Sequence, residues 1–293
     1  MHGAAGGCAA PQTYQTRLQV WREAADGLAA FGGRTGVTEV QAVGRAGKVF
    51  MVDSGGYPAV YDYATKTLTI GGTQIMGGAG SIAGALWAHS SGVLLCDAKL
   101  TADSMYSCYR SADNGVTWTK VLNYDDFAAT IYGTAVTTSD FMLKRTECDN
   151  GWIVGSFYAA GADGTNINRL IRSKDAGETW EFGIDIPLAS HARHMHEVHW
   201  DPYRKVLWAA GGDSGVGDGV GCELYWSQDY GATWNIFTGT RQCTGVIPTP
   251  SGLYVLIDDN VNYVVEYYAG TTAAAVVAAT KVQVFNPLGG HLS

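Results

Sequence analysis

The chain has 293 residues, a formal net charge of −8, charged side chains at 16% of positions, and 39 glycines, 16 tyrosines and 9 tryptophans. Such a length can bury a sizeable core, and abundant Gly and aromatic residues favour short strands with tight turns over long helices. The 19 Lys and Arg residues are scattered. This argues against a nucleic-acid-binding protein, because phosphate contacts need clustered basic residues.

The N-terminal segment, residues 1–38, opens with MHGAAGGCAAPQTYQ. It lacks a basic region followed by an apolar one, so we expect no signal peptide, and no apolar run approaches the length of a membrane span. We expect a protein that stays in the cell that made it, was trimmed at its start, or leaves by another route such as assembly into a virion complex. The strand-like stretch TYQTRLQVW is expected to close a ring of the units that follow, or to add part of a sixth.

From Glu39 to Phe285 the sequence divides into five units, each predicted to contain four strands as two hairpins in series. The three central units repeat one eight-residue pattern, Ser-x-Asp-x-Gly-x-Thr-Trp, as SADNGVTW, SKDAGETW and SQDYGATW. Each copy lies between two strand-like runs and is therefore predicted to be the turn between the third and fourth strands. The first and last units show the same strand pattern without this turn.

The residues shared by the three copies of the turn have a structural explanation. Short polar side chains such as Ser and Asp hydrogen-bond backbone N–H groups within a turn, Gly takes the positive φ that other residues resist, and Trp adds a large apolar surface. The residues concerned are Ser111, Asp113, Gly115 and Trp118, then Ser173, Asp175, Gly177 and Trp180, then Ser227, Asp229, Gly231 and Trp234. We therefore assign the three aspartates to turn structure and not to catalysis.

The turn pattern resembles the Asp-box, or BNR repeat, of sialidases and related β-propellers. The resemblance implies an all-β fold, a β-propeller of about five to six four-stranded antiparallel blades with Asp-box turns, formed by residues 39–293. It also implies that these turns face away from the active site. The opposite, upper face collects the starts of first strands and the ends of second strands.

Polar residues recur at these upper-face positions. Second strands end in Asp53, Asp97, Asp213 and Asp258. First strands begin near Lys144, Arg145 and Glu147, near Arg193, His194 and His196, and near Arg241 and Gln242. We expect carboxylates, guanidinium groups and imidazoles to converge on one mouth there.

Histidines concentrate in HARHMHEVHWDPYRKVLWAAGGDSG, which holds four of the seven in the chain. On a strand, His194 and His196 point to the same side, which suits a shared divalent metal ion or a base with its orienting partner. The alternative is that these imidazoles hydrogen-bond within a polar channel. No other cofactor is expected, and His89, alone on another first strand, is expected to be packed.

The six cysteines show no zinc-binding spacing and are too few for a disulfide scaffold. Cys96 and Cys108 could face each other across a hairpin, whereas buried free thiols are the simpler expectation.

The resemblance to sialidases implies a substrate-binding role for Arg145, Arg193 and Arg241, since that family clamps a carboxylate with three arginines. The sequence departs from the family in two respects. It lacks the N-terminal Arg-Ile-Pro motif of sialidases, and it shows no evident counterpart of the Tyr/Glu pair that serves as their nucleophile.

Three functions follow as alternatives. An enzyme acting on an acidic polysaccharide would be a hydrolase with Asp97 or Asp213 as acid/base, or a lyase with His194 or His196 as base. A glycan-binding protein without turnover, such as a phage adhesin, would stack sugars on Tyr158, Tyr203 or Trp208. A purely structural propeller would need neither feature.

Overall fold

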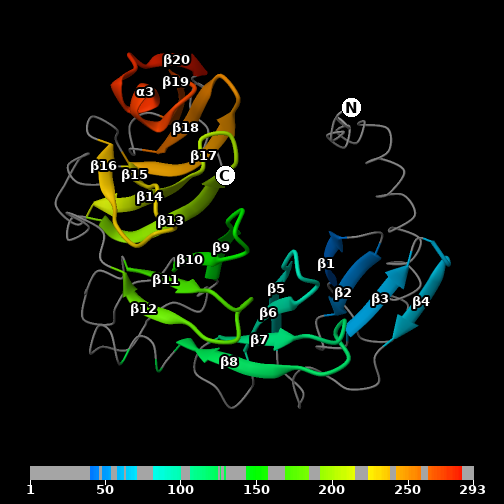
Figure 1. The fold of residues 1–293 in the computed structure, drawn as a ribbon. Coiled ribbons are helices and arrows are strands. Elements are labelled where there is room, and N and C mark those ends of the chain that lie inside the picture. Colours follow the sequence, from blue (N-terminus) through cyan, green and yellow to red (C-terminus); the bar gives the residue numbers. More distant parts are fainter. Residues whose placement is uncertain are drawn as a thin grey trace, which may run out of the picture.

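The computed structural model describes residues 40–45, 48–53, 58–62, 64–70, 82–99, 106–124, 126, 129, 143–157, 169–184, 192–214, 224–237, 242–258 and 263–285. These residues form five antiparallel sheets, each made of four strands that are consecutive in the chain (Figure 1). None of the helices in the described part of the chain is long and apolar enough to cross a membrane.

Within each sheet the strands follow one another in chain order. The first sheet contains β1 (Val40–Arg45), β2 (Lys48–Asp53), β3 (Pro58–Asp62) and β4 (Thr67–Ile70). The second contains β5 (Ile82–Ala88), β6 (Leu94–Lys99), β7 (Ser107–Ser111) and β8 (Thr119–Asn123). The third contains β9 (Leu143–Glu147), β10 (Ile153–Phe157), β11 (Leu170–Ser173) and β12 (Glu181–Ile184).

The last two sheets repeat this order. The fourth sheet contains β13 (Ala192–Asp201), β14 (Val206–Ser214), β15 (Leu224–Ser227) and β16 (Asn235–Phe237). The fifth contains β17 (Cys243–Thr249), β18 (Gly252–Asp258), β19 (Tyr263–Ala269) and β20 (Val282–Phe285), with the short helix α3 (Ala273–Ala278) between its last two strands.

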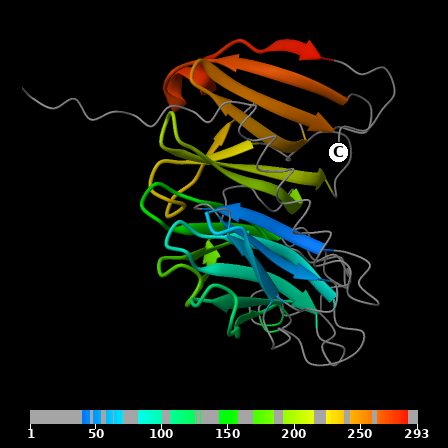
Figure 2. The same cartoon turned by 90° about the vertical axis from the view of Figure 1, so that its right-hand side faces the viewer.

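The five sheets follow one another along an arc, with the first strand of each sheet on the inner side and the fourth on the outer side (Figure 1). Figure 2 shows from the side that the fifth sheet lies at one end of the molecule, next to the fourth. This is a propeller-like arrangement, so the expected all-β fold of four-stranded antiparallel sheets is confirmed. The number of blades in a complete ring stays a prediction, because the segment 1–38 lies outside the described residues.

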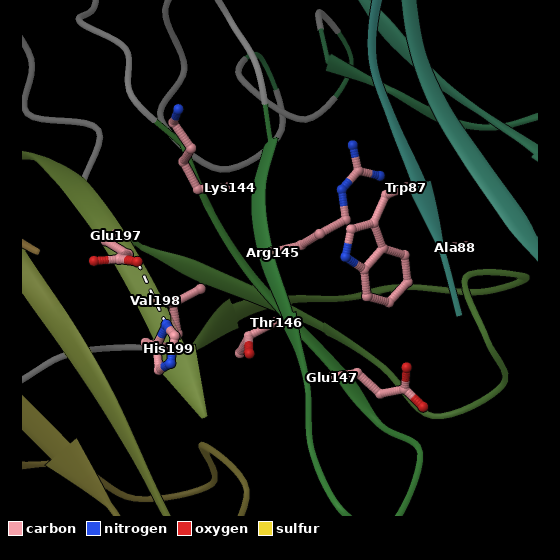
Figure 3. A pocket seen from close by; sticks show the side chains of 9 residues that line it. All are labelled: Trp87, Ala88, Lys144, Arg145, Thr146, Glu147, Glu197, Val198 and His199. Atoms are coloured by element: carbon pink, nitrogen blue, oxygen red, sulfur yellow. Dashed lines mark ion pairs between the residues drawn. The ribbon is translucent and has the colours of Figure 1, made fainter. Parts of the chain in front are cut away.

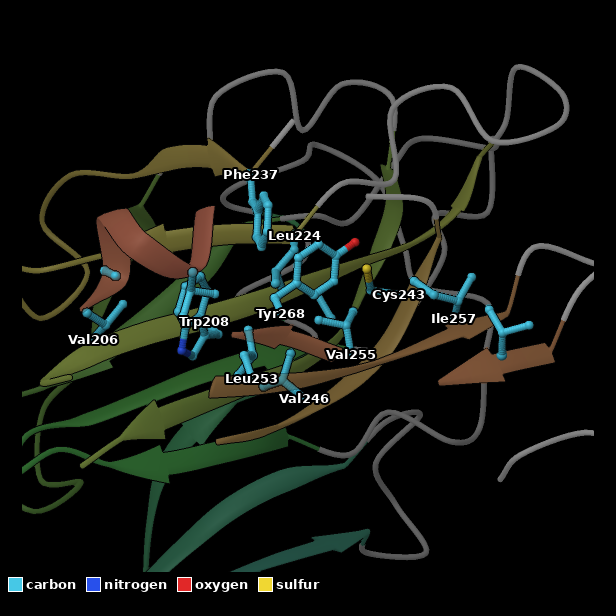
Figure 4. Close-up of a cluster of buried hydrophobic side chains, with 14 residues drawn as sticks. Val206, Trp208, Leu224, Phe237, Cys243, Val246, Leu253, Val255, Ile257 and Tyr268 are labelled. Atoms are coloured by element: carbon cyan, nitrogen blue, oxygen red, sulfur yellow. The ribbon is translucent and has the colours of Figure 1, made fainter. Parts of the chain in front are cut away.

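Apolar side chains fill the space between neighbouring sheets. Figure 4 shows the cluster between the fourth and fifth sheets, in which Trp208 and Phe237 meet Val255, Ile257 and Tyr268. The rings of Phe237 and Tyr268 pack edge to face, with centroids 4.9 Å apart. Burying each such side chain contributes about 1.5–3 kcal/mol to stability, so these interfaces hold the sheets together.

The repeated turns connect the third and fourth strands of the second, third and fourth sheets, as the sequence predicted. In the first copy, Ser111 Oγ donates to Asp113 Oδ1 at 2.8 Å and accepts from the backbone N–H of Gly115 at 2.8 Å. The Asp113 carboxylate also accepts from the N–H and the hydroxyl of Thr117 at 2.8 and 2.6 Å. The other two copies repeat these contacts at 2.5 to 2.8 Å.

The glycine of the pattern is required by the backbone. Gly115, Gly177 and Gly231 have φ values of 84°, 83° and 83°, which lie in the left-handed region that favours glycine. The indoles of Trp118 and Trp234 then donate to the carbonyls of Gly115 and Gly231. Each aspartate is therefore occupied in shaping its own turn.

Arginine side chains tie neighbouring sheets together at this end of the molecule. Arg110 Nε donates to the carbonyl of Ala176 at 3.1 Å, and Arg172 Nη1 donates to the carbonyl of Tyr230 at 3.3 Å. In both cases the arginine directly precedes the Ser of one turn, and the carbonyl belongs to the residue before the Gly of the next. From the fourth sheet, Arg204 reaches the carbonyls of Gly270 and Thr249 in the fifth.

Candidate functional site

The structure describes only part of the upper face, on which the sequence analysis predicts the site. Most of the residues that connect second to third strands and fourth to first strands lie outside the described ranges, whereas nearly all of the connections at the opposite end are inside them. Arg241 lies outside the described residues, and so do the side chains of Arg193 and Asp213. Their predicted roles therefore remain predictions.

Asp97 and Arg145 form a buried ion pair. Arg145, on β9, binds Asp97 Oδ2, on β6, and the hydroxyl of Tyr124 donates to Asp97 Oδ1 at 2.7 Å. The two charged side chains are 0% and 2% exposed. The sequence predicted an acid/base and a substrate-binding arginine at these positions, and in this structure the two groups bind each other inside the core.

Burial governs the electrostatics around this pair. Burial raises the pKa of Asp97, while the Arg145 guanidinium and the Tyr124 hydroxyl act in the opposite direction. Burial also raises the pKa of the Cys108 thiol, to about 12, although Arg145 Nη1 lies 3.5 Å from its sulfur. The four described cysteines, Cys96, Cys108, Cys148 and Cys243, are buried and free. The expectation of buried free thiols is confirmed for these four.

A pocket of about 420 Å³ lies along the innermost strands of the second, third and fourth sheets (Figure 3). We call it the channel pocket. It is lined by Trp87, Ala88, Lys144, Arg145, Thr146, Glu147, Glu197, Val198 and His199. Its residues on β5 and β13 come from the middle and later parts of these strands, so the pocket extends toward the end of the molecule that carries the repeated turns.

Several polar side chains of the channel pocket tie one sheet to the next. Glu147 accepts from the backbone N–H of Ser90 at 2.9 Å, and Thr146 Oγ1 accepts from that of Trp200 at 3.0 Å. Glu197 accepts from the N–H of Val246 at 3.0 Å and lies 3.5 Å from His199. The inner wall is therefore polar in part because its side chains stabilise neighbouring strands.

Other lining groups face the pocket more openly. Lys144 is exposed, the indole of Trp87 is half-buried, and the His199 side chain is 39% exposed. Figure 3 shows Lys144 at one end of the pocket and Glu147 at the other, with Glu197 and His199 opposite Trp87. The pocket thus combines an indole, an imidazole, an exposed ammonium group and carboxylate oxygens.

The two predicted metal candidates, His194 and His196, lie together outside this pocket. Their Nε2 atoms are 3.1 Å apart, and Nδ1 of His196 lies 2.8 Å from the carbonyl oxygen of Cys243. His194 is buried and His196 is half-buried. No group of three or more His, Cys, Asp or Glu side chains suited to a metal ion occurs among the described residues.

The remaining candidates are spread over the molecule. Tyr203 is 53% exposed in the hairpin between β13 and β14 and does not line the channel pocket. Trp208 is fully buried and Tyr158 lies outside the described residues. His89 is packed, as expected, with its ring nitrogens 2.7 Å from Ser91 Oγ and 2.8 Å from the carbonyl of Gly151.

Sequence reasoning missed Trp87, Glu197 and His199 as pocket residues. It looked for polar residues at strand ends, whereas these three lie within the first strands or near their later ends. The signal that could have found Glu197 and His199 is their alternation with Val198 along β13, whereas Trp87 lies in a wholly apolar strand and had no such signal.

No family model matches this chain, and a search of curated proteins also found no match. Among solved structures, YCF48 bound to a D1 peptide is similar with a TM-score of 0.40 and 17% identity, over 75% of this chain and 60% of that one. A Hadza microbial sialidase, Hz136, is similar with a TM-score of 0.44 and 15% identity, over 85% of this chain and 58% of the sialidase. Regucalcin from Agrobacterium tumefaciens, described as calcium-binding, is similar with a TM-score of 0.40 and 18% identity, over 75% of this chain and 69% of regucalcin. The chain thus spans about three fifths of the length of the first two structures.

Proposed function

We propose that this chain is an Asp-box β-propeller that binds an acidic glycan in the channel pocket without cleaving it. The observation that carries the proposal is the lining of that pocket, where the half-buried indole of Trp87 lies opposite Glu197 and His199, with exposed Lys144 at one end. Its volume of about 420 Å³ falls within the range of about 300–1,000 Å³ that is typical of small-ligand pockets.

These groups suit the chemistry of an acidic sugar. The apolar face of a sugar ring packs on an aromatic plate, hydroxyl groups donate to carboxylate oxygens, and an ammonium group attracts a sugar carboxylate. Glu197 already accepts one backbone hydrogen bond, but a carboxylate offers about four acceptor positions, so it retains capacity for a ligand. An adhesin of a virus particle would be a protein of this kind.

Binding is favoured over turnover because the Asp97 carboxylate is buried and paired with Arg145. A general acid or base has to come within hydrogen-bonding distance of the substrate, whereas the Asp97 side chain is 0% exposed and bound to Arg145. The pocket carboxylates Glu147 and Glu197 hold neighbouring strands through backbone N–H groups. Because these contacts hold both carboxylates in place, they support a role in binding a ligand and not in proton transfer.

The proposal is tested by screening purified protein against sialosides and uronic-acid polysaccharides, then measuring affinity for the ligand found by calorimetry. Lys144→Glu, a change of an exposed side chain, should abolish binding of acidic glycans, and Trp87→Leu should weaken binding by about tenfold for a lost stacking contact. Matched controls are Lys120→Glu and Tyr203→Ala, which alter an exposed lysine and an exposed tyrosine outside the pocket. Both controls should bind like the unmodified protein.

Mass spectrometry of the glycan after incubation separates binding from turnover. We expect intact glycan. A product with an added water would identify a hydrolase and an unsaturated product a lyase, and either would replace the proposal. Equal binding by the Lys144→Glu and Lys120→Glu proteins would show that the channel pocket is not the binding site.

A further inference from the structure

The two histidines His194 and His196, which we call the histidine pair, lie at an irregularity in strand β13. His194 pairs with Gly212 and Met195 with Gly211, but the next pairing joins Glu197 to Ala210, so His196 is an extra residue in a β-bulge. Such bulges change the direction of side chains and are frequent beside functional sites. Here the bulge lets the neighbouring residues His196 and Glu197 both reach the fifth sheet.

The hydrogen bond of His196 to Cys243 defines where its lone pair lies. A carbonyl oxygen can only accept, so the Nδ1 atom of His196, 2.8 Å from the Cys243 oxygen, carries the proton. Nε2 of a neutral His196 therefore has a lone pair, and this atom lies 3.1 Å from Nε2 of His194. Two imidazole nitrogens this close share either the N–H proton of a neutral His194, in an N–H···N hydrogen bond, or a metal ion.

The spacing of the two nitrogens suits a metal ion. With metal–nitrogen bonds of about 2.0–2.1 Å, two nitrogens 3.1 Å apart subtend an angle of roughly 100° at the ion, close to tetrahedral. The contact between Nδ1 and the Cys243 carbonyl is the kind of outer-shell hydrogen bond that orients metal-binding histidines. Two imidazoles favour ions such as Zn²⁺, Ni²⁺ and Cu²⁺ over Mg²⁺ or Ca²⁺.

The backbone makes room for the His196 ring. A Cβ atom at Gly212 would lie 2.2 Å from its Nε2, so the imidazole edge occupies the space that any other side chain would need. The two rings, with centroids 4.9 Å apart and inclined at 45°, are held by the bulge, by Gly212 and by the Cys243 carbonyl. Both the bulge and the glycine have a cost in sheet stability, which a bound ion would offset.

We propose that the histidine pair binds one divalent transition-metal ion of the zinc type. Within the described part of the chain no third His, Cys, Asp or Glu side chain suited to a metal ion gathers with them. Neither histidine lines the channel pocket, so this site is independent of the proposed glycan binding.

The test is calorimetry of chelator-treated protein with ZnCl₂, and separately with MgCl₂. We expect one equivalent of Zn²⁺ to bind and Mg²⁺ not to bind. His194→Ala and His196→Asn should each weaken Zn²⁺ binding by at least about tenfold. The asparagine amide can still donate to the Cys243 carbonyl in place of Nδ1, so the second variant removes the metal ligand and keeps the local hydrogen bond.

His199→Ala is the matched control, because His199 lies on the same strand, and its side chain is 39% exposed and outside the histidine pair. This variant should bind Zn²⁺ like the unmodified protein. The proposal is overturned if the unmodified protein takes up no Zn²⁺, or if the folded His196→Asn protein binds it equally well. Glycan binding measured with and without chelator should be the same, so the two proposals fail separately.

Discussion

At the scale of single residues, several of the described polar groups stabilise the protein through contacts with one another. Asp97 and Arg145 illustrate this, because their charges are removed from water and satisfied by each other and by Tyr124. A buried pair of this kind adds little net stability compared with apolar side chains, but losing one partner leaves an uncompensated charge. The position of such a residue in the sequence therefore says little about its accessibility to a substrate.

Arg145→Met should lower the free energy of unfolding by about 3–5 kcal/mol, because the Asp97 carboxylate is then buried without its cationic partner. Urea denaturation measures the change. The double variant Asp97→Asn with Arg145→Met should recover part of the loss. As a surface comparison, Lys205→Met removes an exposed pair with Asp149 and should cost at most about 1 kcal/mol. Equal losses in the two single variants would contradict the burial argument.

Glycine substitution distinguishes backbone strain from crowding. Gly177 and Gly92 both have positive φ, but a Cβ at Gly177 would lie 2.8 Å from Leu95, whereas one at Gly92 would meet nothing within 4 Å. Gly92→Ala should cost about 1 kcal/mol for the φ alone, and Gly177→Ala about 1–3 kcal/mol more for overpacking. Thermal denaturation of both variants provides the comparison.

At the scale of elements, the repeated turn was the feature best predicted from sequence, because its hydrogen bonds are local and each letter has a local reason. The strand pairs around it were predicted for the same reason. The ion pair of Asp97 with Arg145 and the contact of the bulge residue His196 with Cys243 were not, since both join residues far apart in the chain. The channel pocket, built from three separate sheets, was beyond local reasoning as well.

The turns should make the protein sensitive to acid. Hydrogen bonds from the Thr117 hydroxyl and N–H, and from Ser111, lower the pKa of Asp113 to about 2. Burial opposes the shift at Asp175 and Asp229, but the same kinds of hydrogen bond lower their pKa values below the usual value of 3.8. A lowered pKa in the folded state means stability that is present above about pH 4 and is lost as the pH falls toward 2.

The melting temperature should therefore decrease steeply between about pH 4 and pH 2. The variant Asp113→Asn, Asp175→Asn and Asp229→Asn, which keeps an acceptor oxygen but cannot titrate, should be less stable at pH 7 and should show a shallower pH dependence in this window. If the melting temperature of the variant changed with pH as steeply as that of the unmodified protein, the acid sensitivity would belong to other carboxylates.

At the scale of the whole molecule, the sheets are not held equally. The second to fifth sheets are joined at one end by Arg110, Arg172 and Arg204 in addition to their apolar interfaces. Between the first and second sheets, an apolar cluster around Phe50, Ala88 and Leu94 is described, and no arginine of this kind joins the residues described there. The first sheet should therefore separate most easily.

Native-state hydrogen exchange tests this order. Amides of β2 and β3 should exchange at a lower opening free energy than those of β10 and β14, whose buried residues lie between sheets on both sides. Arg172→Gln should bring the exchange of the third and fourth sheets closer to that of the first. Uniform protection across all five sheets would show that the molecule opens as one cooperative unit.

The arginine ties have a consequence for how a chain of this kind can change its length. Each unit with the pattern Arg-Ser-x-Asp-x-Gly-x-Thr-Trp offers a guanidinium donor to the unit after it and a carbonyl acceptor to the unit before it, which is a head-to-tail joint. Duplication of such a unit would supply both halves of every new joint. The run ends where Trp226 stands in place of the arginine, so insertions of whole units should be tolerated upstream of that tryptophan and not after it.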